Sequence, residues 1–216
     1  MNVVLQETLR LPAGFANLGA FREWTKSESY PHRGQFAYLG CDFWIDLSTE
    51  TFLHDQLKNE FVIVIGGLVK AGRLGRYLGD RMRLVNETAD MSVEPDGMFA
   101  SAKALKAGRV RLEEGADSLE LIGSPQMVLE IISPTSVRKD TVVLSDLYFS
   151  AGIEEYWLVN PLGGQLAFDI FRPAAKEYAA VEASGGWLPS AVFGKSFRLV
   201  QETTDDGLPD FQLQVR

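Results

Sequence analysis

The sequence predicts an α+β or α/β fold in which a mixed β-sheet is flanked by helices and extra strands follow toward the C-terminus. Two apolar runs, 127–132 and 155–159, have the composition of buried strands. Residues 138–151 between them carry apolar side chains at helical spacing, and Gly152 follows as a helix stop. A strand, a helix and a second strand in this order predict a right-handed parallel crossover at the centre of the sheet.

The chain before this crossover alternates short strands with two helices. In order, we expect a strand at 3–5, a helix within 15–26, a loop at 27–34, a hairpin of strands 36–39 and 42–47, a helix from about 51 to about 71, strands at 81–85, 91–94 and 98–100, a helical turn at 103–106, and a hairpin-like pair at 109–112 and 119–122. The β-branched run 62–65 could also form a strand, but Leu53 and Leu57 continue its apolar spacing as a helix.

The chain after the crossover is rich in strands. These are expected at 166–171, 178–181, 191–193, 197–199 and 211–215. No internal repeat or low-complexity linker interrupts the sequence, so we expect residues 1–216 to form a single domain.

The composition is that of a globular protein, and it narrows the functional classes. The chain has 216 residues, 46% hydrophobic, with a net charge of -8 and a pI of about 4.9. This acidity argues against tight, non-specific binding of nucleic acid. The single cysteine, Cys41, allows no intramolecular disulfide and suits a reducing cytoplasm. No apolar run is long enough for a membrane span, and the N-terminus does not have the pattern of a signal peptide, so we expect a cytoplasmic protein.

The most informative residue is Glu130, a carboxylate in the middle of the apolar run 127–132. An unpaired carboxylate is costly to bury, so Glu130 must be paired, protonated or bound to a cation. Val128, Glu130 and Ile132 share one face of the expected strand, because alternate residues of a strand point the same way.

Asp96, in the segment 93–97, is the best partner for Glu130. If the strands on either side are neighbours, the two carboxylates converge. Two carboxylates with carbonyl oxygens and water suit Mg²⁺, which would activate a water and stabilise charge on a phosphate. An aspartate after a proline is also a common turn residue, so this alternative remains open.

At this point a family resemblance becomes visible. The segments Glu-Pro-Asp-Gly at 94–97, Pro-Gln-Met-Val-Leu-Glu-Ile-Ile-Ser-Pro-Thr-Ser at 125–136, Arg-Lys-Asp at 138–140 and Leu-Tyr-Phe-Ser-Ala-Gly-Ile-Glu-Glu-Tyr-Trp-Leu-Val-Asn at 147–160 resemble the Uma-two family, restriction-endonuclease-like proteins of the PD-(D/E)XK nuclease superfamily. The resemblance implies a restriction-endonuclease-like core at about 35–175 and a Mg²⁺-dependent nuclease, with Mn²⁺ as a possible substitute.

The resemblance also implies roles for individual residues. Asp96 and Glu130 would be metal ligands, and the family's upstream acidic position falls near Asp42. His54 falls on the helix after the hairpin, where such proteins often carry a histidine, although a surface or capping histidine would look the same.

The chain departs from the superfamily at the catalytic lysine. The position two residues after the glutamate is Ile132, and the helix position that supplies a lysine in many relatives is Leu144. Lys139 is the nearest candidate to hold the attacking water or offset charge in the transition state. It could equally be an exposed lysine beside Asp140, which we expect at the start of the helix. Trp157 and its neighbour Tyr156 should be core residues, since they lie inside a strand.

Three functions therefore compete. The first is a Mg²⁺-dependent endonuclease that hydrolyses DNA phosphodiester bonds, with Asp96, Glu130 and Lys139 as its site. The second is a lapsed nuclease fold that serves as a binding or assembly module. The third is a structural protein in which Glu130 pairs with Arg138. We expect DNA as the substrate partner and a homodimer, because cutting both strands needs two sites and the C-terminal strands could form an interface.

Overall fold

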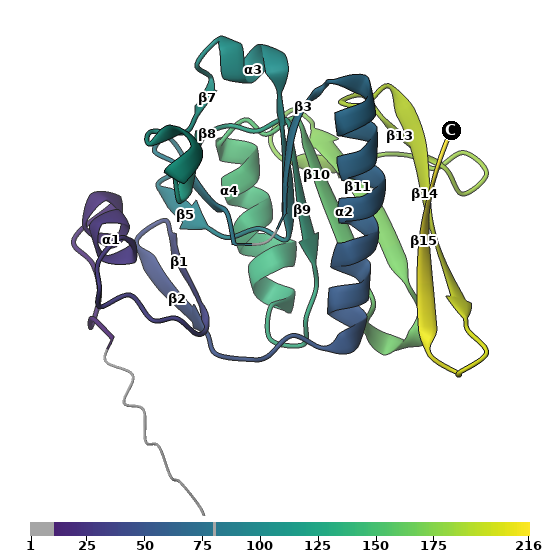
Figure 1. Cartoon of the computed structure of the whole chain (residues 1–216), viewed down its shortest axis with the longest axis horizontal. Coiled ribbons are helices and arrows are strands. Elements are labelled where there is room, and N and C mark those ends of the chain that lie inside the picture. The colour runs from purple at the N-terminus through teal and green to yellow at the C-terminus, as the bar shows by residue number, and fades with distance from the viewer. Residues whose placement is uncertain (1–10, 80) are drawn as a thin grey trace, which may run out of the picture.

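The computed structural model describes residues 11–79 and 81–216, and has the expected architecture of mixed sheets flanked by helices (Figure 1). The strand expected at 3–5 lies outside the described residues. The helices are α1 (Leu18–Thr25), α2 (Phe52–Gly72), α3 (Ala102–Lys106) and α4 (Leu144–Ser150). None of the described helices is long and apolar enough to cross a membrane.

The central sheet contains the predicted crossover. Its strands, in spatial order, are β12 (Tyr178–Ala180), β11 (Ala167–Pro173), β10 (Glu155–Asn160), β9 (Met127–Ile131), β6 (Gly97–Ser101) and β3 (Gly75–Gly79). The β9 and β10 strands are parallel, with Glu130 opposite Leu158, and every other pair is antiparallel. The prediction of a parallel pair joined through a helix is confirmed.

Two further sheets complete the fold. The second six-stranded sheet runs in the order β2 (Asp42–Asp46), β1 (Gln35–Leu39), β5 (Met91–Val93), β4 (Arg83–Asn86), β8 (Glu120–Gly123) and β7 (Val110–Arg111). A three-stranded sheet near the C-terminus contains β13 (Leu188–Ser190), β14 (Lys195–Thr203) and β15 (Pro209–Val215). The extra C-terminal strands are therefore present, and they pack against α2 beside the central sheet (Figure 1).

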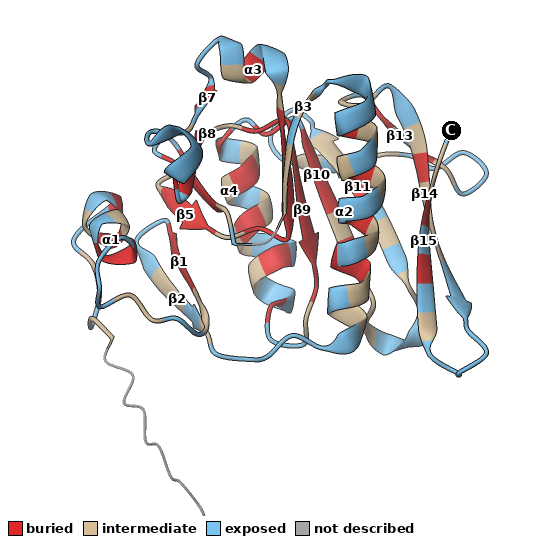
Figure 2. Cartoon of the chain, viewed as in Figure 1, coloured by how far each residue is buried: buried red, intermediate tan, exposed pale blue. Residues whose placement is uncertain are grey.

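The central sheet has a hydrophobic core on each face (Figure 2). On one face, Phe61 of α2 packs with Trp157 and with residues of the C-terminal sheet. On the other, Leu144 and Tyr148 of α4 pack with the second six-stranded sheet. A smaller aromatic cluster joins α1 to the outer face of that second sheet, around Phe36. Burial on both faces explains why β9 and β10 are apolar along their length.

The long helix α2 forms as expected because its sequence has clear ends and one apolar stripe. The Thr51 side chain accepts a hydrogen bond from the His54 backbone N–H, at 3.3 Å, and so caps the first turn. Arg73, with a φ of 51°, ends the helix in the left-handed conformation. Leu57, Phe61 and Ile65 are buried between these ends, which confirms a helix through the β-branched run.

One expected strand was wrong, and one strand was missed. A strand was expected at 191–193, but the third C-terminal strand is β13, which ends at Ser190. The buried Glu155 carboxylate accepts hydrogen bonds from the backbone N–H groups of Ala191 and Val192, so those groups are not available to a strand partner. The β3 strand was missed because glycines bound it. Gly75 lies so close to β6 that a Cβ atom there would be 2.1 Å from the carbonyl oxygen of Ala100.

Replacing Glu155 by alanine should lower the free energy of unfolding by about 3 kcal/mol, because a buried carboxylate with several partners would be lost. Besides the two backbone groups, Glu155 accepts from Ser190, Trp157 and Arg172. Urea unfolding followed by tryptophan fluorescence measures the change.

The adjacent residue supplies a matched control, because Glu154 is exposed. Glu154→Ala should change the free energy of unfolding by less than about 0.5 kcal/mol. Equal effects of the two substitutions would show that the buried network around Glu155 does not stabilise the fold.

Candidate functional site

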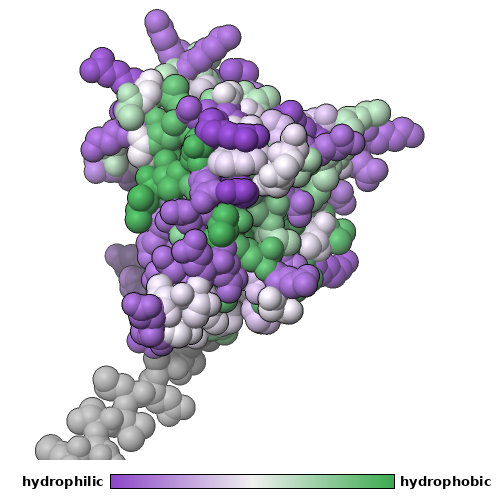
Figure 3. All heavy atoms as spheres, turned by 90° about the vertical axis from the view of Figure 1, so that its right-hand side faces the viewer, coloured by the Kyte–Doolittle hydropathy of each residue, from purple (hydrophilic) through white to green (hydrophobic). Residues whose placement is uncertain are grey.

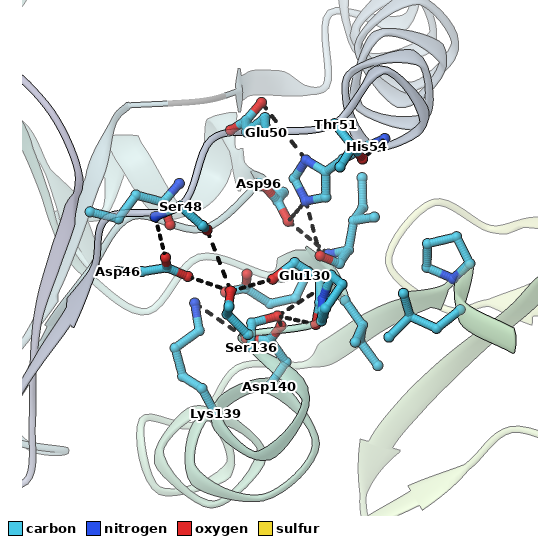
Figure 4. Close-up of a pocket in the computed structure, with 18 of the residues that line it drawn as sticks. Asp46, Ser48, Glu50, Thr51, His54, Asp96, Glu130, Ser136, Lys139 and Asp140 are labelled. Carbon is cyan, nitrogen blue, oxygen red and sulfur yellow. Dashed lines mark hydrogen bonds and ion pairs between the residues drawn. The ribbon is translucent and has the colours of Figure 1, made fainter.

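Four of the residues singled out from the sequence, His54, Asp96, Glu130 and Lys139, meet at one cavity of about 310 Å³ (Figure 4). We call it the carboxylate cavity, because Asp96, Glu130 and Asp140 line it. Its walls come from the end of β9, the first turn of α2, and the loop and helical turn before α4. Residues far apart in the sequence are thus brought to one point by the crossover and by α2.

Glu130 lies at the inner end of this cavity and is almost completely buried, with 2% of its surface exposed. It shares a face of β9 with Val128, as the alternation predicted. Its Oε1 atom accepts a hydrogen bond from the Tyr148 hydroxyl at 2.5 Å. Burial raises the pKa of Glu130 well above its usual value, and the Asp140 and Asp96 charges add to this while Lys139 opposes it.

Asp96 reaches the same cavity from the loop between β5 and β6. The β6 strand is antiparallel to β9, with Gly97 opposite Leu129. Asp96, the residue before Gly97, therefore lies at the level of Glu130, the residue after Leu129. The Asp96 Oδ2 atom accepts a hydrogen bond from the backbone N–H of Ile131, at 2.7 Å. The structure therefore brings Asp96 and Glu130 together from neighbouring strands, as the sequence indicated.

Lys139 and Asp140 lie on a π-helical segment, Lys139–Val143, directly before α4. The Lys139 Nζ atom is 3.3 Å from Asp140 Oδ1, and only 17% of the lysine side chain is exposed. Despite burial, the negative charges of Glu130, Asp140 and then Asp96 raise the pKa of Lys139. Lys139 is therefore a cation of the cavity and not an exposed surface lysine.

Asp140 lines the cavity, a position that the sequence analysis did not predict. It was expected at the start of the helix and does lie in the first turn of the π-helical segment, where it is 1% exposed and its N–H donates to the Ser136 carbonyl. The Ser136 hydroxyl donates to the Asp140 carboxylate, while Asp140 Oδ1 accepts no hydrogen bond from a described residue and is held by its ion pair with Lys139. Burial raises the pKa of Asp140. In the sequence, the only indication that Asp140 lies in the cavity was its closeness to Glu130 along the chain.

The first turns of α2 contribute His54 and Lys58. The His54 Nε2 atom donates to the Ile131 carbonyl oxygen at 3.0 Å and lies 3.5 Å from Asp96 Oδ2. Burial alone would lower the pKa of His54, but the hydrogen bond to Asp96 and the Asp96 charge raise it above its usual value. Lys58 is buried, with Nζ 2.8 Å from Glu50 Oε1 and 3.9 Å from Asp96 Oδ1. The sequence analysis missed Lys58, although its four-residue spacing from His54 places both on one helix face.

The acidic residue from the early hairpin is not the one expected. Asp42 pairs with Leu39 at the far end of β2, is exposed and does not line the carboxylate cavity. Asp46 lines the cavity instead, and its Oδ2 accepts from the Thr135 hydroxyl at 2.8 Å. Both residues occupy the same face of β2, so alternation alone could not show which end meets the cavity.

The two positions at which a superfamily lysine was expected hold buried apolar residues. Ile132 is buried, and its N–H donates to the Val159 carbonyl oxygen. Leu144 is fully buried in the core beneath α4. Arg138 is exposed, whereas Glu130 is buried and bonded to Tyr148, so the idea that Glu130 is merely paired with Arg138 is wrong.

The donor set fits a divalent cation that prefers oxygen ligands. Three buried carboxylates meet here, and burial raises the pKa of Glu130 and Asp140, so a bound cation would stabilise their charged forms. Within residues 11–79 and 81–216, no group of three or more His, Cys, Asp or Glu side chains is already arranged as a metal site. A cation here would therefore complete its coordination with carbonyl oxygens and water, as Mg²⁺ commonly does.

Comparison with known proteins agrees with this architecture. A search of solved structures matches the crystal structure of "a putative nuclease belonging to DUF820" from Anabaena variabilis, with a TM-score of 0.63 and 20% identity over 82% of this chain and 90% of that one. At this identity the match shows the fold. The comparison with curated proteins gave no match.

The family model Uma2, described as "Putative restriction endonuclease", matches residues 24–202. That range contains every residue of the carboxylate cavity, from Gln35 to Leu162. Because the match covers most of the 216 residues, this chain belongs to the Uma2 family.

Proposed function

We propose that this protein is a Mg²⁺-dependent endonuclease that hydrolyses phosphodiester bonds in DNA, with Mn²⁺ able to replace Mg²⁺. The observation that carries the proposal is the meeting of Asp96 and Glu130 with Lys139 in one cavity. Two carboxylates and an ammonium provide the oxygen ligands and the cation that phosphoryl chemistry requires. Membership of the Uma2 family supports the same reading.

Asp96 and Glu130 would hold the metal, with Asp140 beside them. When bound, the ion would activate a water and stabilise negative charge on the phosphate. The residues of the chain prepare the site for this. Tyr148 fixes the orientation of Glu130, and the Ile131 N–H fixes that of Asp96. These contacts hold the carboxylates before any ligand arrives, which lowers the cost of organising the site.

Lys139 would offset the negative charge that develops on the scissile phosphate. Its raised pKa keeps the ammonium charged at neutral pH, and the π-helical segment directs it into the cavity. It would thereby replace the lysine that the chain lacks at Ile132 and Leu144. Lys58 of α2 is a second candidate for this role, because its Nζ atom is 3.9 Å from Asp96 Oδ1.

A second function is a catalytically lapsed nuclease fold that acts as a binding or assembly module. The apolar residues at both expected lysine positions, Ile132 and Leu144, favour it. Metal binding without cleavage would identify this alternative.

We further propose that the protein acts in the cytoplasm as a homodimer. Cutting both DNA strands requires two sites, which a dimer would provide. The side of the molecule that carries the C-terminal strands shows hydrophobic residues gathered among hydrophilic ones, and this surface could serve as the interface (Figure 3). Sedimentation velocity over a range of concentrations tests this state independently of activity.

Glu130→Gln should abolish detectable cleavage of plasmid and single-stranded DNA and weaken Mn²⁺ binding at least tenfold, because a charged metal ligand is replaced by a neutral amide. Cleavage is measured on gels with Mg²⁺ or Mn²⁺, and Mn²⁺ binding by electron paramagnetic resonance.

Glu114→Gln is the matched control, since Glu114 is exposed on a loop, and both properties should remain native. The enzyme proposal fails if the native protein neither binds Mn²⁺ nor cleaves either DNA. Binding without cleavage would support the lapsed alternative.

Without a divalent cation, Glu130→Gln should be more stable than the native protein above pH 4.5, and the difference should grow with pH. Burial raises the folded-state pKa of Glu130 above its ordinary value of 4.5, so the folded protein holds this proton more tightly than the unfolded chain. The stability that protonation provides is present below pH 4.5 and is lost as the pH rises through the folded-state pKa.

Urea unfolding at a series of pH values, with chelator present, measures this difference. Adding Mn²⁺ should narrow it, because the cation stabilises only the native carboxylate. A constant difference between pH 4 and pH 8 would show that Glu130 does not titrate in the folded protein as expected.

Lys139→Ala should lower the cleavage rate by a factor of about 100 or more while leaving Mn²⁺ bound, because one preorganised positive group is removed from the site. Lys58→Ala tests the second candidate, and Lys70→Ala provides an exposed lysine of α2 as control. A native cleavage rate in Lys139→Ala, with a large loss in Lys58→Ala, would assign the role to Lys58.

A further inference from the structure

A second cavity, of about 210 Å³, opens beside the carboxylate cavity and is not used by the chemistry described above. We call it the hairpin cavity, because residues of the β1–β2 hairpin form much of its wall. It shares six lining residues with the carboxylate cavity: Gln35, Asp46, Glu94, Thr135, Ser136 and Lys139. A ligand in one cavity is therefore adjacent to a ligand in the other.

The hairpin contributes four different kinds of side chain to the wall of this cavity. Gln35 is opposite Asp46, and Ala37 is opposite Trp44, so these four residues share one face of the hairpin. The cavity thus has a flat indole at its wall, a small alanine beside it, and an amide and a carboxylate on the side toward the carboxylate cavity.

Trp44 differs from the other three tryptophans of the chain. Trp24 and Trp157 contact other aromatic rings, and Trp187 lies under the guanidinium groups of two arginines. Within the part of the chain that the structure describes, Trp44 has no ring or cation partner, and its indole N–H has no hydrogen bond. It packs against the hydrophobic core that includes Leu144 and Tyr148, is only partly buried, and lines the hairpin cavity.

The polar groups of the cavity are also available. The Gln35 side-chain amide makes no hydrogen bond to any described residue, so it can both donate and accept. Although partial burial opposes it, hydrogen bonds from Ser48 and then Thr135 lower the pKa of Asp46 and keep it an acceptor. An indole in the cavity wall, with an unsatisfied amide and a carboxylate nearby, matches a flat heterocycle that carries donors and acceptors.

We propose that the hairpin cavity binds an unpaired nucleobase of the nucleic-acid strand whose phosphate enters the carboxylate cavity. Trp44 stacks on the base, and Gln35 and Asp46 contact its polar edge. This inference rests on the proposed nuclease function for the position of the phosphate, and it adds the substrate class. A base inside a duplex is stacked and paired, so it reaches such a cavity only from a single strand or after leaving the helix.

The acidity of the protein agrees with this mode of binding. A net charge of -8 gives little general attraction for phosphates. Base stacking is independent of phosphate charge, and one stacked base changes affinity by a factor of about 5 to 150. Stacking on Trp44 would therefore supply affinity that the overall charge does not.

The test measures binding in chelator, so that cleavage does not contribute. Fluorescence anisotropy would follow a labelled single-stranded ten-nucleotide DNA, the same strand made entirely of abasic sites, and the matching duplex. We expect the native protein to prefer the single strand with bases to both other probes by a factor of about 10 or more.

Trp44→Ala should weaken binding of the single strand by a factor of about 10 or more, and Trp44→Phe should restore most of it, since a smaller ring still stacks. Trp187→Ala is the matched control, a partly buried tryptophan outside both cavities, and should bind as the native protein does. Gln35→Ala, which leaves the indole in place, should reduce the preference among the four bases.

Quenching of tryptophan fluorescence by deoxynucleoside monophosphates supplies a second readout, which should be lost in Trp44→Phe. Equal binding of the abasic strand, native affinity in Trp44→Ala, or no binding to any of the three probes would overturn the proposal. A protein that binds bases through Trp44 but never cleaves DNA would support the base site and refute the nuclease function. If the native protein cleaves DNA and Trp44→Ala binds the single strand with native affinity, the nuclease function is supported and the base site is refuted.

Discussion

The burial of Glu130 in the middle of β9 is the constraint on which the site depends. A carboxylate with 2% exposure in a strand that is apolar on both faces requires partners that reach it inside the fold. Tyr148 reaches it from α4, Asp96 approaches from the loop before β6, and Lys139 approaches from the π-helical segment. The parallel crossover is what brings these elements to one end of the strand.

A second buried glutamate shows why Glu130 should be functional. Glu155 begins the adjacent strand, is fully buried, and receives bonds from Arg172, Trp157, Ser190 and two backbone N–H groups. Its acceptors are satisfied by the protein, so it stabilises the C-terminal segment. Glu130 has one hydrogen bond, lies beside two further carboxylates and has a raised pKa. Glu155 has hydrogen-bond partners for both carboxylate oxygens, which indicates a structural role, whereas Glu130 has few partners and is therefore the candidate metal ligand.

Local patterns were sufficient to predict the elements that build the site. The apolar runs of β9 and β10, the caps of α2 and the alternation around Glu130 depend on neighbouring residues, and the pairing of Asp96 with Glu130 followed from them. Whether Asp42 or Asp46 lines the cavity depends on which end of the hairpin lies near α2. That depends on contacts between segments distant in the sequence, which local patterns do not show. The burial of Asp140 in the cavity was missed for a similar reason, since Asp140 lies on a π-helical segment of which the sequence gives no sign.

The position of Lys139 connects the two cavities physically. Its side chain lines both, and three carboxylates hold its charge, so a single ammonium faces the place where a base and a phosphate would meet. At the two positions where a superfamily lysine was expected, Ile132 and Leu144 are buried in the core. These apolar residues are compatible with a site whose cation is Lys139, which lies before α4 and lines the cavity beside the β1–β2 hairpin, where the substrate strand would enter.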